Sequence, residues 1–117
     1  MKQPTIDEET LNILIKSLGQ ECAQEVVNEF IILSLENIKA AINFLDEENF
    51  EEFAKHCHKI KSNIGYLGGK KLEKMCIDIE ELNYHKKFNE MKAIESEFKA
   101  CCKETLDSLE NRGYGIV

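Results

Sequence analysis

The side chains most able to do chemistry gather in one stretch of the sequence, from His56 to Leu72. His58 carries the reactive group, and the lysines and small residues around it are Lys55, Lys61, Ser62 and Gly65. A neutral imidazole is a nucleophile, and neighbouring ammonium groups disfavour its protonated form. If the ring attacked phosphorus, Lys61 could stabilise the charge on the phosphoryl oxygens, and the small residues would leave room for a partner. These residue types make His58 a candidate for a phosphate-carrying histidine.

A helix must position these side chains. Apolar residues recur at three-and-four spacing through the segment, at Phe50, Phe53, Cys57, Ile60, Ile64 and Leu67. This spacing predicts a helix that buries one stripe. At about 100° per residue, His58, Ser62 and Gly65 fall along the edge of that stripe, with Lys55 and Lys61 one turn away on either side. On spacing alone, a helical histidine between lysines is more often part of a solvated surface.

The run from His58 to Glu80 resembles the signature of histidine phosphotransfer (HPt) domains. That signature reads His-x-Leu-Lys-Gly-Ser-x, then Gly-Ala-x-x-Leu, then a small residue or Cys and a Leu-Glu pair. The positions that match it here are His58, Ile60, Lys61, Gly68, Leu72, Cys76 and the Ile79-Glu80 pair. The segments Ile6–Gly19 and Phe30–Leu45 also resemble the opening helices of the family, so the likeness covers nearly the whole chain.

The sequence departs from this signature at three positions. Ser62 stands where the family usually has glycine, Asn63 where it usually has serine, and Gly69 where alanine is common. Serine is still small, so Ser62 narrows the space around the His58 ring without closing it.

The resemblance implies a phosphocarrier without a kinase domain, which passes a phosphoryl group between His58 and the aspartates of receiver (response regulator) domains. A hybrid sensor histidine kinase is a further partner that it implies. The receiver would bring Mg²⁺, its acidic ligands and its lysine, so this chain needs no cofactor and no metal of its own. It would supply the nucleophile, Lys61 for charge stabilisation, and a docking face that includes Lys55, Ser62, Gly65 and Tyr66. Residues of the neighbouring helix and of the first helix would complete that face.

The remaining helices follow from the same spacing. Thr5–Leu18 reads as a first helix, with Thr5 as its cap and Glu8 completing a capping box. Further helices are predicted over Gln20–Leu45, from a cap at Asn49 or Asp46 to about Leu67, over Lys70–Tyr84 and over Phe88–Asn111. Because no segment alternates with period two, these helices predict an all-α fold, an antiparallel four-helix bundle with a short additional N-terminal helix.

Length and composition limit the remaining possibilities. The 117 residues, with one proline, indicate a single domain over 1–117 that acts as a monomer. No segment reaches the roughly 18 apolar residues of a membrane span, and Met1–Thr10 has acids where a signal peptide has its apolar run. The odd number of cysteines, five, without a C-x-x-C pair indicates reduced thiols and no zinc site. These features predict a cytoplasmic protein.

Charge is unevenly distributed along the chain, whose net charge is −7. Residues Met1–Glu52 carry a net −9, Phe53–Lys74 a net +5 and Met75–Val117 a net −3. The acidic total argues against nucleic acid as a partner, because binding it requires the neutralisation of many phosphates. The basic patch around His58 suits a partner with an acidic pocket.

Two other kinds of function compete with the phosphocarrier. A metal-carboxylate bundle would need Glu-x-x-His, but the residues three before His56, His58 and His85 are Phe53, Lys55 and Leu82. A bundle of the same fold could also dock on a receiver or kinase and inhibit it without carrying phosphate. His56 lies about 200° around the helix from His58 and is expected at a partly buried edge. His85 is expected near a helix end, where its charge would be favourable.

Overall fold

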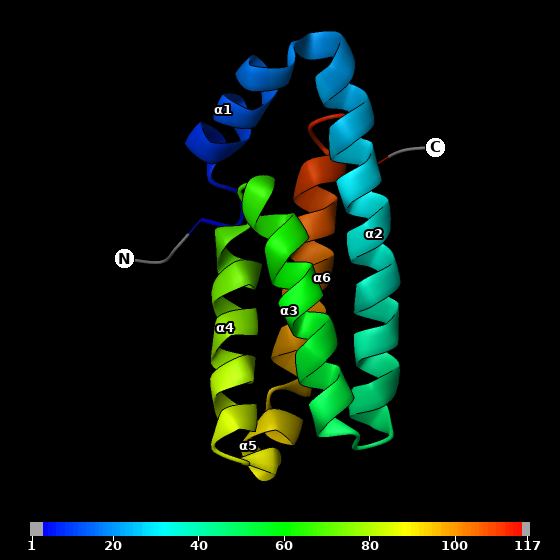
Figure 1. The fold of residues 1–117 in the computed structure, drawn as a ribbon, viewed down its shortest axis with the longest axis vertical. Helices are drawn as coiled ribbons and strands as arrows, with labels where there is room; N and C mark the ends of the chain where they lie inside the picture. Colours follow the sequence, from blue (N-terminus) through cyan, green and yellow to red (C-terminus); the bar gives the residue numbers. More distant parts are fainter. Residues whose placement is uncertain (1–3, 116–117) are drawn as a thin grey trace.

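The computed structural model describes residues 4–115 of the chain, so the ends of the predicted domain, 1–3 and 116–117, lie outside the described residues. The helices are α1 (Glu8–Leu18), α2 (Gln20–Asp46), α3 (Phe50–Tyr66), α4 (Lys70–Tyr84), α5 (Phe88–Ala93) and α6 (Glu95–Glu110). The helices α2, α3, α4 and α6 run up and down beside one another, with α1 at one end of the bundle and α5 at the other (Figure 1). Residues 4–115 contain no strand, and the predicted all-α bundle with an additional N-terminal helix is confirmed.

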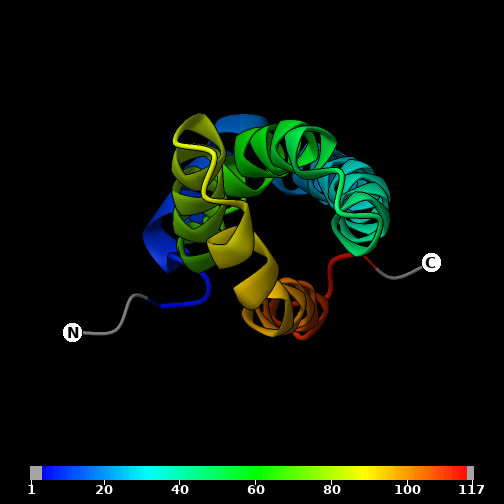
Figure 2. The ribbon, with the colours of Figure 1, turned by 90° about the horizontal axis from the view of Figure 1, so that it is seen from below.

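Helix α3 lies at the centre of one layer. It packs along both α2 and α4, and seen from the end of the bundle these three helices form an arc that α6 closes (Figure 2). The inward stripe of α3 is buried, including Phe53, Cys57, Ile60 and Ile64. Phe53 meets Phe98 of α6 edge to face, with ring centroids 5.3 Å apart, so the core reaches across the arc. Because α3 is held on three sides, only its outer edges remain for function.

The turn between α3 and α4 needs its two glycines. Gly68 has φ of +81°, a left-handed conformation that glycine adopts without strain, and a Cβ there would overlap the backbone oxygen of Asp7. A Cβ on Gly69 would overlap the side chain of Ile64, which accounts for glycine where the HPt signature commonly has alanine. The chain can therefore reverse directly into α4.

The first helix begins later than the sequence predicted. Thr5 is not its cap: Asp7 is, with its side chain accepting a hydrogen bond from the backbone N–H of Glu9. The segment before it lies against the α3–α4 turn, where the N–H of Asp7 donates to the carbonyl of Gly68 (2.6 Å) and Ile6 is buried. Thr5 instead donates its hydroxyl to Glu104 of α6 (2.5 Å). This contact with a distant part of the chain overrides the local capping box.

The predicted last helix, Phe88–Asn111, is two helices in the structure. The backbone at Ile94 leaves helical geometry, with φ of −91° and ψ of 7°, and separates α5 from α6. Phe88 of α5 stacks on Phe50 (centroids 5.1 Å apart) and Met91 is buried, so α5 closes the end of the bundle before α6 turns along it. The apolar spacing continues through Met91, Ile94 and Phe98, and the break therefore left no mark in the sequence pattern.

The cysteines behave largely as small core residues. All five are free thiols; Cys22 is exposed, whereas Cys57, Cys76, Cys101 and Cys102 are buried. Contact with the thiol of Cys76, together with burial, raises the pKa of Cys57, and burial raises the pKa of Cys102. The thiols of Cys57 and Cys102 therefore stay protonated and unreactive at neutral pH.

Candidate functional site

His58 stands on the edge of α3 that faces α4. Asn49 caps the start of α3 by accepting from the backbone N–H of Glu52, which confirms one of the two predicted caps. Cys57, the residue before His58, is fully buried, and His58 lies about 100° farther around the helix, at the edge of the buried stripe. The His58 side chain is 63% exposed, and a partner can reach its ring.

A carboxylate from the neighbouring helix supports the ring. Oε1 of Glu80, on α4, lies 2.7 Å from Nδ1 of His58, and Oε2 of the same carboxylate accepts from Nζ of Lys61 at 2.7 Å. Glu80 thus joins the histidine and the lysine that the sequence singled out. An ionised carboxylate can only accept, so Nδ1 carries a hydrogen in this geometry. In the neutral ring the lone pair is then on Nε2, the nitrogen that Glu80 leaves free.

This geometry corrects the expected electrostatics of the histidine. The two lysines do not act on the ring as unpaired cations, because Lys61 is bound to Glu80 and Lys55 lies 3.3 Å from Glu52. The charge closest to the ring is the carboxylate of Glu80. The spacing along α3 could not indicate this carboxylate, because the helical period does not show which residues of α4 face α3. The Leu-Glu pair of the HPt signature was the one signal that could have indicated Glu80.

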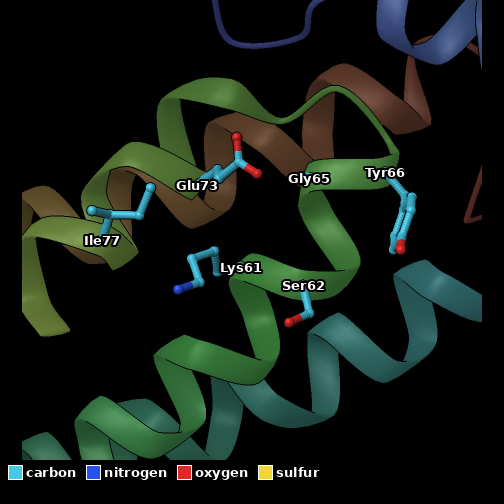
Figure 3. Close-up of a pocket in the computed structure, with 6 residues that line it drawn as sticks. All are labelled: Lys61, Ser62, Gly65, Tyr66, Glu73 and Ile77. Atoms are coloured by element: carbon cyan, nitrogen blue, oxygen red, sulfur yellow. The ribbon is translucent and has the colours of Figure 1, made fainter.

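Two surface hollows flank the Lys61–Glu80 ion pair. The larger, of about 500 Å³, is lined by Lys61, Ser62, Gly65, Tyr66, Glu73 and Ile77 (Figure 3). The smaller, of about 240 Å³, is lined by Glu51, Ala54, Lys55, His58, Glu80 and Asn83. The structure therefore brings Lys61 and three predicted docking residues to one hollow, and Lys55 and the histidine to the other. The first helix, which was expected to contribute to the docking face, lines neither of these two hollows.

The side chains of the larger hollow are held in different ways. Ser62 donates its hydroxyl to the backbone oxygen of His58 (3.1 Å), so serine at this position bonds within its own helix. Tyr66 is 62% exposed and stacks on Phe30 of α2, with ring centroids 5.8 Å apart. The rim of this hollow thus combines a hydroxyl that is already bonded with an accessible aromatic ring.

The other two histidines lie apart from this site. His56 is half-buried on the α2 side of α3, with its Nδ1 2.8 Å from the backbone oxygen of Glu52 and its ring 5.1 Å from that of Phe44. This is the partly buried edge position expected from the usual burial of histidine. His85 is exposed and follows the last residue of α4, as expected for a histidine at a helix end.

The structure is thus a helical bundle with an exposed histidine, in contact with a carboxylate, on the surface of one long helix. Residues 10–112 match the family model of the Hpt domain, and the chain belongs to this family. Hpt domains serve histidine phosphotransfer in two-component systems, where they interact with receiver domains and kinases and have no kinase activity of their own. No curated protein and no solved structure matches the chain. Within residues 4–115, no helix is long and apolar enough to cross a membrane.

Proposed function

We propose that this protein carries a phosphoryl group on His58 and passes it to and from receiver-domain aspartates in a His-Asp phosphorelay. The observation that supports this most strongly is the 2.7 Å contact between Nδ1 of His58 and Glu80, on a ring that is otherwise exposed. It leaves Nε2 as the nucleophile on a surface that a partner can cover.

The transfer step follows from this arrangement. Nε2 attacks the phosphorus of the receiver's aspartyl phosphate; the N–P bond forms while the bond from phosphorus to the aspartate oxygen breaks, and the aspartate leaves as a carboxylate. Nδ1 keeps its hydrogen, so the phosphorylated ring is positively charged. Glu80 stabilises that charge through the hydrogen bond it already makes. The reverse reaction uses the same contacts.

Lys61 stabilises the phosphoryl oxygens in this proposal. Its ammonium is held by Glu80 and its side chain is 24% exposed, so it is ordered before the partner arrives. A flexible stem allows the ammonium to turn from the carboxylate toward the incoming group. Glu80 would then keep the ring in place while Lys61 neutralises the phosphoryl charge.

The partners follow from the same chemistry. Receiver domains bring the aspartyl phosphate and the Mg²⁺ that it requires, and a hybrid sensor histidine kinase is a candidate source of phosphate. We propose that the chain acts as a monomeric single domain in the cytoplasm, with Lys55, Ser62, Gly65 and Tyr66 on its docking face.

The test is phosphate transfer from a panel of purified receiver domains, phosphorylated with labelled phosphate in Mg²⁺. Acid-labile, alkali-stable label on the normal chain and none on His58→Gln would support the carrier. Label on neither chain, with a receiver still bound, would favour the inhibitory binding module instead. Label that persists on His58→Gln would show that another residue is the acceptor.

A further inference from the structure

Glu73 is the one acidic residue in the basic segment Phe53–Lys74, which has six basic residues. The chemistry proposed for His58 makes no use of it. The structure places it on α4 in the wall of the larger hollow, opposite the α3 residues Ser62 and Gly65 (Figure 3). An acidic side chain in a hollow that Lys61 also lines, within a segment of opposite net charge, calls for a physical explanation.

The carboxylate of Glu73 is directed toward α3 and is only weakly paired. It projects toward Gly65 (Figure 3), and a Cβ on that residue would overlap its Oε2. Its other oxygen lies 3.5 Å from Nζ of Lys70, and both side chains are partly exposed (31% for Lys70 and 28% for Glu73). Such an ion pair contributes little. The carboxylate therefore keeps acceptor capacity for a group that enters the hollow.

The cation that lines the hollow does not neutralise Glu73 either. Lys61 lines the same hollow, but its ammonium is bound to Glu80 at 2.7 Å. The Lys61–Glu80 ion pair is thus separate from the Glu73 carboxylate, although Lys61 and Glu73 line the same hollow.

The apolar walls of the hollow suit a long cationic side chain. Ile77 is 42% exposed and Tyr66 is 62% exposed, while one face of the Tyr66 ring is covered by Phe30. Methylene groups of lysine or arginine pack on such surfaces while the charged end reaches a carboxylate or an aromatic face. A volume of about 500 Å³ has room for one such side chain.

We propose that this hollow receives a lysine or arginine side chain of the receiver domain, and that Glu73 selects receivers that have this cation. The inference rests on the proposed function, because the occupant is the domain that presents its aspartate to His58. Gly65 lies two helical turns from His58 on the same edge of α3, and an interface of ordinary size, about 800 Å² on each partner, covers both.

Glu73 thereby gives the docking face a mixed charge pattern. Lys61, once it turns from Glu80, favours the acids around the receiver's aspartate, whereas Glu73 requires a cation at one position. A receiver with an acid at that position would be rejected by like-charge repulsion. Selectivity then comes from one side chain outside the phosphotransfer chemistry.

The first experiment measures affinity and transfer separately. The receiver of the panel that binds most tightly is titrated, unphosphorylated, into the normal chain, Glu73→Gln and the control Glu81→Gln, which changes an exposed acid of α4 outside this hollow. We expect Glu73→Gln to raise Kd about five- to tenfold and to weaken its dependence on salt. The control should stay within about twofold of the normal chain. The transfer rate at saturating receiver should not change in Glu73→Gln.

A second experiment identifies the partner's cation. Lysines and arginines of that receiver are replaced by methionine one at a time and titrated against the normal chain and Glu73→Gln. One replacement should raise Kd for the normal chain and make no further difference with Glu73→Gln, which is the coupling expected for a direct pair.

Several results would overturn the inference. These are an unchanged Kd for Glu73→Gln, a loss confined to the saturated transfer rate, or the absence of coupling to any receiver cation. Self-association of the normal chain that Glu73→Gln abolishes would assign the hollow to a second copy instead. If no receiver binds at all, the partner class is wrong and the inference fails with it. A receiver that binds through Glu73 and leaves no label on His58 would reject the carrier function and retain this inference.

Discussion

The two edges of α3 each carry a histidine, but the neighbouring helices give the two rings different surroundings. On the edge toward α4, His58 is exposed and contacts the carboxylate of Glu80. On the edge toward α2, His56 is half-buried, packs on Phe44 and contacts a backbone carbonyl of its own helix. Two residues of the same type in the same helix therefore differ in exposure and in the charge beside the ring.

The difference lies in charge and access. Both rings have Nδ1 next to an oxygen that accepts, so both would keep their lone pair on Nε2. Only the carboxylate beside His58 can stabilise the positive charge that a phosphorylated ring acquires. The hollow that His58 lines also leaves space for a partner, whereas an aromatic ring covers part of His56. In the proposed function, the facing helix, more than the local sequence, therefore decides which histidine can react.

The largest difference in phosphate transfer is expected when His58 and His56 are replaced by glutamine one at a time. His58→Gln should reduce phosphate label from a receiver to background, because it removes the nucleophile. His56→Gln should retain the label within about twofold, because that ring takes no part in the step. Equal loss in both variants, with both still folded by circular dichroism, would remove the distinction between the edges.

Replacing Glu80 should have the next largest effect. In Glu80→Gln the amide can donate to Nδ1 and favour the ring form whose lone pair is there, and it cannot stabilise a charged ring. We expect the transfer rate at saturating receiver to fall about a hundredfold. Nitrogen chemical shifts of His58 should show hydrogen on Nδ1 in the normal chain and a shift toward Nε2 in the variant. An unchanged rate would mean that the carboxylate only packs against the ring.

A smaller effect is expected for Lys61→Ala. This variant keeps the ring and Glu80 but loses the ammonium that, in the proposed function, stabilises the phosphoryl oxygens, so we expect the transfer rate to fall about tenfold. The nitrogen shifts of His58 should stay close to those of the normal chain, which separates this lysine from Glu80. Transfer at the normal rate would exclude the electrostatic role of Lys61.

The smallest effect is expected at Gly65, which leaves space on the edge of α3 that faces α4. In Gly65→Ala the added methyl should displace the flexible carboxylate of Glu73 while the helix gains about 0.5–1 kcal/mol of stability from alanine. We expect a slightly higher free energy of unfolding in urea and an approximately threefold weaker affinity for the receiver. Unchanged affinity with higher stability would show that the space over Gly65 is not used in docking.

Much of the fold could be predicted because local signals agreed with packing. The predicted bounds of α4, Lys70–Tyr84, are those of the structure, since the glycines before it and the apolar spacing within it indicate the same limits. The cap at Asp7 and the break at Ile94 could not be predicted in this way. Asp7 is placed by its contact with Gly68, and the break by the packing of α5 across the end of the bundle.

The residues of the candidate site also differ in whether local signals could place them. Residues that act through their position on α3, such as His58, Ser62 and Gly65, could be placed on one edge from the helical period alone. Glu80 and Glu73 could not, because their roles depend on which way α4 is rotated against α3. Their contacts, to His58 and over Gly65, join residues that no spacing within a single helix relates.

The bond between Asp7 and Gly68 also bears on the order in which the protein folds. Most contacts of the bundle join helices that follow one another in the chain, and these form quickly. The contact of Asp7 with the α3–α4 turn must instead close a long loop around α2 and α3, with a larger entropic cost. We therefore expect the α2–α3–α4 layer to collapse first and the N-terminal segment to dock late. Weakening that contact should then accelerate unfolding and leave the folding rate nearly unchanged.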